Sequence, residues 1–406
     1  MNHDIQVGVL PALTVGLVVW GLFSARLGRW NISAPIAFVG AGLLLGSGSS
    51  PLIHVSVESE SAKVVTELTL AVVLFGDAAT VSLRRLRGDA GLPSRLLVVG
   101  LPLTIAAGTV AAHLLLPGLS WWVCAVVGAA VAPTDAALGS AIIEDERVPA
   151  RIRRLLNVES GLNDGIATPF VNFFLVAALV GTSFDIGSKG GALVSLALGA
   201  VIGAAVGACA GRGLEIAQRR GLAEQAFVPI ATTAVAIGAY SLAVAGNGNA
   251  FVAAFVAGIA YRAAHSVEVP AATLKFTRDC GSVLSLVVWF GFGLVLPGVL
   301  GRTTWREVAF ALAALTVVRM VPVAAALVGT GLDRATVAVV GWFGPRGLAS
   351  VVFALIALGT LPAADADRVI LAIGITVLLS VILHGATAAP VAGRYGASHR
   401  GDESLG

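Results

Sequence analysis

The chain has 406 residues, of which 57% are hydrophobic and only 12% are charged, and its formal net charge is +3. Soluble domains carry about 25% charged residues, so this composition excludes a soluble globular protein or a disordered chain. It indicates an all-α polytopic membrane protein, because the apolar runs lack the alternation typical of a β-barrel.

The apolar runs predict about thirteen transmembrane helices, at about 20 residues for each crossing. In chain order they are expected at 5–23, 32–47, 64–81, 95–116, 121–143, 155–181, 190–211, 226–245, 249–264, 281–300, 306–328, 334–360 and 367–391. The stretch 265–280 is expected to be a connector, and 392–406 a short cytoplasmic tail. The Gly and Ala residues of 190–211 favour close helix packing.

The basic residues predict the orientation of the chain. Loops after odd-numbered helices, together with the tail, hold 19 of the 26 Lys and Arg residues, and the remaining loops hold five. Lys and Arg concentrate in cytoplasmic loops. We therefore expect a multi-pass protein of the cell (plasma) membrane, with its N-terminus outside and its C-terminus in the cytoplasm.

Two predicted helices, the fifth and the twelfth, contain a proline at matched positions. Pro133 lies in the sequence APTD and Pro345 in the sequence GPRG. Proline removes a backbone donor and clashes with the preceding turn, so both helices should unwind there and cross near the membrane midplane. These two helices run in opposite directions, so residues 1–181 and 226–391 are predicted to form inverted six-helix repeats. The helix at 190–211 would link the repeats within one transmembrane domain, and paired broken helices indicate a transport site.

The stretch 155–170, LLNVESGLNDGIATPF, places acidic residues in an apolar helix that has no basic residue. Glu159 and Asn163 are four residues apart on one helix face, and Ser160 and Asp164 form a second such pair beside them. An ionisable group at membrane depth costs about 2.5–3.5 kcal/mol on insertion scales, so these residues indicate function.

The buried charges of the predicted spans do not balance. We expect Glu159 to pair with Arg319, and Arg346 to pair with the C-terminal end of a half-helix or with a carboxylate. Asp135 and Asp164 are then surplus, and with a hydroxyl and free carbonyls they supply the oxygen ligands that a small monovalent cation needs. No His or Cys stands at ligand spacing nearby, which disfavours a transition-metal site.

Two close carboxylates in a low-dielectric cavity repel each other, and desolvation adds to this effect. One of them can therefore hold a proton near neutral pH. Because such a group binds either a proton or a cation, competition combined with alternating access would give exchange.

At these residues the sequence resembles the cation:proton antiporter superfamily, and specifically its electroneutral sodium/proton exchanger branch (the NhaP and NHE type). The matching elements are Thr134-Asp135, the ESGLND motif at 159–164, Arg319, and GPRG with Arg346. The segments LGRWNISAPIAFVGAGLLLG and LFGDAATVSLRRLR also look like the family's second and third helices. The resemblance covers essentially the whole chain.

The resemblance implies a thirteen-helix homodimer with a dimerisation part and a mobile six-helix core that works by an elevator-like motion. It implies that Asp164 is the principal carrier of cation and proton. Asp135, Thr134 (through its carbonyl) and Ser160 would complete the cation shell.

The resemblance also implies roles for the neighbouring residues. Glu159 and Arg319 would form a structural ion pair, and Asn163 would be a polar gate. An Asn rather than an Asp at position 163 goes with one-for-one exchange in this family.

The predicted function is antiport of Na⁺ or Li⁺ against H⁺ across a lipid bilayer, with no enzymatic activity, no cofactor and no nucleic-acid partner. The alternative within the same fold is K⁺/H⁺ antiport. A passive cation channel would need a file of sites, whereas the sequence shows one. An intramembrane protease using Asp135 and Asp164 would leave Arg319 and Arg346 unexplained.

Two further groups of ionisable residues are expected to be ordinary. Glu67 and Asp77 fall near the ends of the third helix, where interfacial solvation accounts for them and an entrance funnel is the alternative. All six histidines are placed at span ends, in loops or in the tail, so none is expected to sense pH.

Overall fold

The computed structural model describes residues 3–30, 32–47, 53, 60–80, 91–180, 186–266 and 269–399. Every regular element in these ranges is a helix, which confirms the predicted fold class. The basic residues Arg84, Arg85, Arg87 and Arg400, which contribute to the predicted orientation, lie outside the described residues.

Each expected crossing is present, either as one helix or as a series of shorter helical pieces. Eight helices of the described residues are long and apolar enough to span a membrane, and four shorter ones are apolar. In chain order the elements are α1 (His3–Gly28), α2 (Ala34–Gly46), α3 (Glu60–Thr80), α5 (Gly91–Arg95), η1 (Leu96–Gly100), α6 (Leu101–Leu115), α7 (Trp121–Ala130), α8 (Ser140–Ile143), α9 (Ala150–Val180), α10 (Ile186–Arg219), α11 (Phe227–Ala245), α12 (Ala250–Ala264), α13 (Ala271–Arg302), α14 (Trp305–Leu315), α15 (Val317–Ala326), α16 (Arg334–Trp342), α17 (Leu348–Leu358) and α18 (Ala363–His399).

Three helices extend furthest beyond an expected end. α10 continues to Arg219, α13 already begins at Ala271 within the expected connector, and α18 continues to His399 within the expected tail. Hydropathy marks where apolar residues stop, but backbone hydrogen bonding can continue into the polar interface. The helices are therefore longer than their apolar parts.

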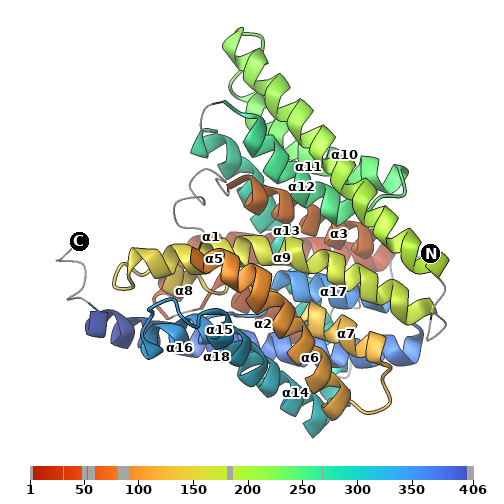
Figure 1. Ribbon diagram of the computed structural model, residues 1–406, viewed down its shortest axis with the longest axis vertical. Helices are drawn as coiled ribbons and strands as arrows, with labels where there is room; N and C mark the ends of the chain where they lie inside the picture. Colours follow the sequence, from red (N-terminus) through yellow and green to blue (C-terminus); the bar gives the residue numbers. More distant parts are fainter. Residues whose placement is uncertain are drawn as a thin grey trace.

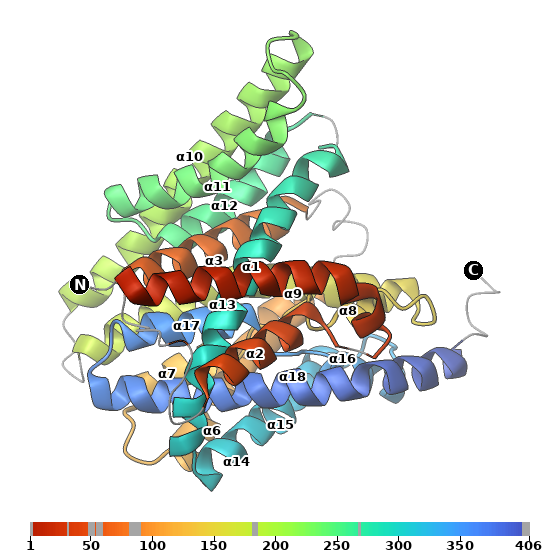
Figure 2. The same ribbon diagram turned by 180° about the vertical axis from the view of Figure 1, so that it is seen from behind.

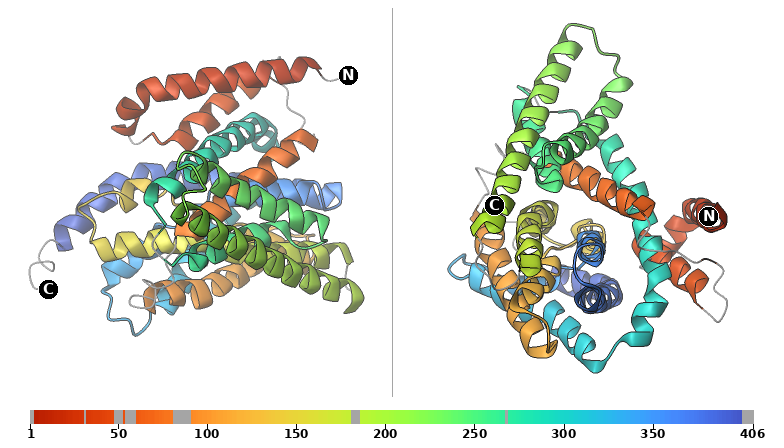
Figure 3. Two further views of the ribbon diagram at one scale, coloured as in Figure 1. Left: turned by 90° about the horizontal axis from the view of Figure 1, so that it is seen from above. Right: turned by 90° about the vertical axis from the view of Figure 1, so that its right-hand side faces the viewer.

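The helices pack as two bundles that share a long seam (Figure 1). The first bundle contains α1–α3 and α10–α13, and the second contains α5–α9 and α14–α18. In Figure 1, α10, α11 and α12 lie at one end of the molecule, and α14 lies toward the other. α1 lies on the outside of the first bundle next to α2 (Figures 2 and 3). α9 contacts α3, α10 and α12 across the seam, and α17 and α18 contact α13.

Within the first bundle, neighbouring helices touch through their backbones. Gly199, Gly203 and Gly207 follow one face of α10, and a Cβ on each would collide with a carbonyl oxygen within residues 249–257, at the start of and along α12. Small residues allow this approach, as the sequence predicts for this helix. Further backbone contacts of this kind lie at Gly42 and Gly293, between α2 and α13, and at Gly258, between α12 and α3.

The two predicted helix breaks are present, and they cross. The fifth crossing is interrupted between Ala130 and Ser140, and the twelfth is non-helical over residues 343–347. The backbone N–H of Asp135 donates to the carbonyl of Pro345 at 2.8 Å, so one break touches the other directly. A third interruption, at Thr316 between α14 and α15, was not predicted.

Candidate functional site

The carboxylate of Asp135 is held at the crossing by backbone donors. Its Oδ1 accepts from the N–H groups of Ala137 at 2.8 Å and Leu138 at 3.1 Å. Its Oδ2 accepts from the N–H of Leu348 at 2.9 Å, the first residue of α17. The start of a helix has free N–H groups and a positive partial charge, which suits an anion. The two breaks together therefore fix one carboxylate at the crossing.

Gly347 allows this close approach. A Cβ at this position would overlap the Cβ, Cγ and Oδ2 atoms of Asp135. Gly344, at the other end of the same non-helical stretch, is equally confined, since a Cβ there would lie 2.6 Å from Nε of Arg319 and 2.9 Å from Cγ2 of Thr134. The glycines of the GPRG sequence thus make room for the site.

Asp164 lies on α9 with 9% of its surface exposed. Its Oδ1 is buried and has no hydrogen-bond partner among the described residues, and the same holds for Oδ1 of Asn163 and Oγ of Ser350. A buried polar atom without a partner is costly and needs an explanation such as a proton, a water or an ion. Ser350, in α17, was not recognised from the sequence, because a single serine in an apolar helix carries no signal of its own.

A hydroxyl network connects α9 to the first break. The Oγ atoms of Thr134 and Ser160 lie 2.9 Å apart, and Nδ2 of Asn163 donates to Oγ1 of Thr134 at 2.7 Å. All three side chains are buried. The structure therefore brings the predicted residues 134, 160 and 163 together, and it shows the side chain of Thr134 in contact with the other two.

Glu159 and Arg319 form an ion pair behind this network. Oε1 of Glu159 and Nη1 of Arg319 are 2.6 Å apart, and their side chains are 3% and 2% exposed. Oε2 of Glu159 and Nη2 and Nε of Arg319 have no other partner among the described residues. Each charge is thus neutralised mainly by the other.

Arg346 caps helix ends and pairs with no carboxylate of the residues that the structure describes. Its Nη1 donates to the carbonyls of Ala132 and Pro133, the second at 3.1 Å, just beyond the end of α7. Its Nη2 lies 3.4 Å from the carbonyl of Ala314, near the end of α14. The C-terminal ends of helices carry free carbonyls and a negative partial charge, which a guanidinium satisfies. Of the two partners considered for Arg346, the structure shows the half-helix end.

Asp77 faces the site from α3, so interfacial solvation alone does not describe its surroundings. A Cβ on Gly161 of α9 would lie 3.8 Å from the Cβ of Asp77. The Asp77 carboxyl is close enough to interact electrostatically with those of Asp135 and Asp164, and with Arg278. The sequence could not show this, because only the packing of α3 against α9 places Asp77 there.

Glu67, at the other end of α3, belongs to a different contact. Its Oε2 accepts a hydrogen bond from the hydroxyl of Tyr240 on α11 at 2.5 Å. This contact joins two helices of the first bundle and does not involve the crossing.

Crossed broken helices that hold carboxylates inside a helical bundle define a membrane transporter with an interior site. The comparison with known families makes this specific. Residues 10–393 match the family described as "Sodium/hydrogen exchanger, transmembrane", and the chain belongs to this family.

Solved structures share the fold. The sodium proton antiporter MjNhaP1 from Methanocaldococcus jannaschii at pH 8 superimposes with a TM-score of 0.76 and 20% sequence identity, over 96% of this chain and 99% of that one. A second structure of MjNhaP1, from an electron-microscopy map, gives a TM-score of 0.69 at 19% identity, over 97% and 98% of the two chains. At these identities the likeness shows the fold alone.

Two yeast proteins are similar over a short stretch. Na(+)/H(+) antiporter 2 of Zygosaccharomyces rouxii is 39% identical over 61 residues, which are 14% of this chain and 8% of that protein. The Na(+)/H(+) antiporter of Saccharomyces cerevisiae is 38% identical over 61 residues, 14% and 6% of the two chains. The matched stretch is thus a small part of both yeast proteins.

Proposed function

We propose that this protein is a secondary antiporter that exchanges Na⁺ or Li⁺ for H⁺ by alternating access. The observation that carries the proposal is the buried Oδ1 of Asp164, which has no partner among the described residues and lies next to Asn163, the residue that bonds Thr134 at the first break. A carboxylate in this position is stabilised by taking up either a proton or a small cation. Membership of the sodium/hydrogen exchanger family supports the same assignment.

The cation shell would consist of oxygen atoms only. Asp164 and Asp135 would supply carboxylate oxygens, and Thr134 and Ser160 a carbonyl or hydroxyl oxygen. Such hard oxygen ligands suit alkali cations. Asn163, hydrogen-bonded to Thr134, would hold the Thr134 side chain in place beside the cation.

The charge balance supports one-for-one exchange. The charge of Glu159 is cancelled by Arg319. Asp135 already accepts hydrogen bonds from three backbone N–H groups. Asp164 is then the carboxylate left to alternate between one proton and one cation, so a full cycle moves no net charge.

Asp77 would extend the acidic path from the site toward one membrane face. With the orientation that the basic loops predict, the end of α3 that carries Asp77 is cytoplasmic. A carboxylate there raises the local concentration of cations near the site.

The same predicted orientation would put the N-terminus outside the cell membrane. We also propose that the protein is a homodimer in the lipid bilayer and has no cofactor.

The test is proton movement in proteoliposomes with an imposed pH gradient, after addition of Na⁺, Li⁺, K⁺ or choline. The wild type is compared with Asp164→Asn and with the control Asp279→Asn, whose carboxylate is exposed and pairs with Lys275. We expect Na⁺ or Li⁺ to collapse the gradient in the wild type and the control only. The rate should be the same whether or not the membrane potential is clamped. A response to K⁺ alone would identify a K⁺/H⁺ antiporter, and no response from a folded wild type would refute the proposal.

A further inference from the structure

Ser380 and His384 lie one turn apart on α18, facing the non-helical segment 343–347 of the twelfth crossing. They are 0% and 1% exposed. The position of His384 differs from the sequence expectation, because it is buried among helices and not at a span end. A buried imidazole and a buried hydroxyl need partners, and these two find them at the break.

The hydrogen bonds form a continuous chain from one end of the segment to the other. The N–H of Arg346 donates to Oγ of Ser380 at 2.6 Å. Nδ1 of His384 lies 3.1 Å from that Oγ and 3.0 Å from the carbonyl of Ser380. Nε2 of His384 lies 2.8 Å from the carbonyl of Trp342, the last residue of α16.

The partners assign the donor on the imidazole. Among the described residues Nε2 has only the carbonyl of Trp342 as a partner, whereas Nδ1 lies near both the hydroxyl and the carbonyl of Ser380. We therefore assign the hydrogen to Nε2, which donates to Trp342, and the neutral ring accepts at Nδ1 from the hydroxyl of Ser380.

The ring of His384 is also fixed from the side. It stacks on the indole of Trp342 with centroids 5.0 Å apart. The indole Nε1 donates to Oγ1 of Thr387, one turn further along α18. These contacts set the direction of the Nε2–H bond.

The segment held in this way is the one that positions Asp135. Pro345 lies between the anchored residues Trp342 and Arg346, and its carbonyl accepts a hydrogen bond from the N–H of Asp135. The N–H of Leu348 donates to the carboxylate of Asp135. The side chain of Arg346 reaches from the same segment to the carbonyls of Ala132 and Pro133. A displacement of residues 342–346 would therefore move Asp135.

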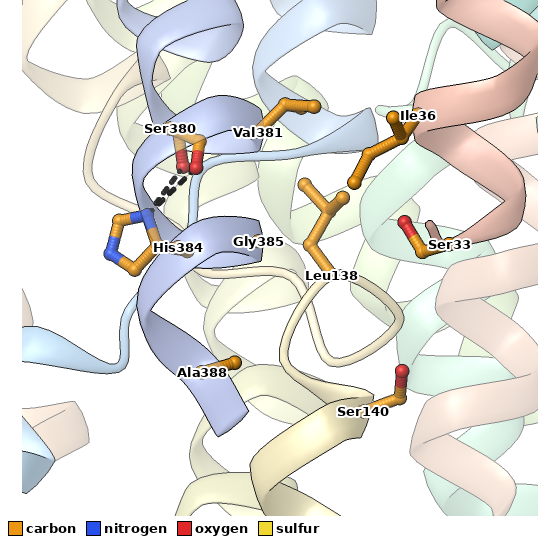
Figure 4. A pocket seen from close by; sticks show the side chains of 9 residues that line it. All are labelled: Ser33, Ile36, Leu138, Ser140, Ser380, Val381, His384, Gly385 and Ala388. Carbon is orange, nitrogen blue, oxygen red and sulfur yellow. Dashed lines mark hydrogen bonds between the residues drawn. The ribbon is translucent and has the colours of Figure 1, made fainter. Parts of the chain in front are cut away.

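The two side chains also border a cavity of about 20 Å³, space for about one water, which Ser33 and Ser140 line from the other side. In Figure 4 the ring of His384 points away from Ser33 and Ser140, and its hydrogen bonds join it to Ser380. The hydrogen bonds of the pair thus go to the crossing segment, and the ring is directed away from the far wall of this cavity.

We propose that Ser380 and His384 are positioning residues for cation binding, which hold the second helix break so that Asp135 keeps its place in the site. The inference rests on the proposed antiport. It predicts that the pair determines the apparent affinity for the cation more than the maximal rate of exchange.

The test uses substitutions that keep or remove single hydrogen bonds. His384→Gln keeps an amide donor near the position of Nε2, whereas His384→Asn is too short to reach Trp342 and His384→Leu has no donor. The control is Thr376→Val, eight residues before His384 on α18, whose buried hydroxyl bonds the carbonyl of Ala372 in its own helix and no other group among the described residues. Apparent KM and maximal rate for Na⁺ and Li⁺ are measured in proteoliposomes at equal amounts of folded protein.

We expect the Asn and Leu variants to raise the apparent KM about tenfold, equivalent to about 1.4 kcal/mol, with a maximal rate within about twofold of the wild type. The Gln variant and the control should stay near the wild-type KM. If the Leu variant does not fold, the comparison of the Asn and Gln variants shows whether the hydrogen bond to Trp342 affects the KM.

Two results would overturn the inference. Folded Asn and Leu variants with wild-type KM would refute it while leaving the proposed antiport intact. A Gln variant as impaired as Leu would show that the loss comes from packing and not from the hydrogen bond to Trp342. By contrast, absence of exchange in the wild type and in the control would refute the proposed function itself.

Discussion

Replacing Gly347 by Ala should weaken cation binding by displacing Asp135. The added methyl group would overlap three atoms of that side chain, so the carboxylate has to move. The movement breaks the hydrogen bond from the N–H of Leu348 to Oδ2, now 2.9 Å. A hydrogen bond to a charged group contributes about 1.5–3 kcal/mol, and 1.4 kcal/mol is a factor of ten, so the apparent KM for Na⁺ or Li⁺ should rise about ten- to a hundredfold.

The matched control is Gly359→Ala at the other end of α17. A Cβ there meets only two backbone oxygens at 3.8 Å, which is ordinary contact. Both variants are reconstituted, and KM is measured from cation-dependent proton movement, with thermal unfolding in detergent as a check of folding. Equal KM values for the two variants, both folded, would refute the view that Gly347 makes room for Asp135.

Four further substitutions address the charges of the site. Asp164→Asn should abolish exchange while leaving the fold intact, measured by proton movement and by size-exclusion chromatography; residual cation-dependent exchange would exclude Asp164 as the carrier. Glu159→Gln leaves Arg319 as an unpaired buried charge, which should cost about 3–5 kcal/mol of stability, and Glu159→Gln combined with Arg319→Met should recover much of it in thermal unfolding. Asp77→Asn should raise KM severalfold for cations presented on the face where Asp77 lies, and an effect of equal size on both faces would contradict a role in approach.

The sequence predicted the two breaks because proline has a local and unavoidable effect on a helix. Pro133 and Pro345 each sit in an otherwise apolar run, so the interruption could be located to within a few residues. The interruption at Thr316 has no such marker, since the nearest proline within α15 is Pro322. It is visible only in the structure, where the carbonyl of Ala314 faces Arg346.

The candidate site was predictable where its residues share one helix. Glu159, Ser160, Asn163 and Asp164 follow helix periodicity, so their common location can be inferred from spacing. Asp77 and His384 come from other helices, and their relation to the site depends on how those helices are rotated and packed. A single sequence contains no direct record of that rotation, so it places Asp77 at the interface and His384 at a span end.

The glycine row of α10 has a mechanical consequence. Where two backbones touch at every fourth residue, the helices cannot slide past each other by less than this four-residue repeat, about 6 Å, without a collision. The glycines on the seam between the bundles meet side chains instead: Gly165 faces the ring of Phe255, Gly385 the end of Ile36, and Gly374 the side chain of Val299. Side chains can change rotamer, whereas backbone contacts cannot yield in this way. The glycine contacts within the first bundle are thus between backbones, whereas those along the seam are with side chains, which can adjust without a shift of the backbone.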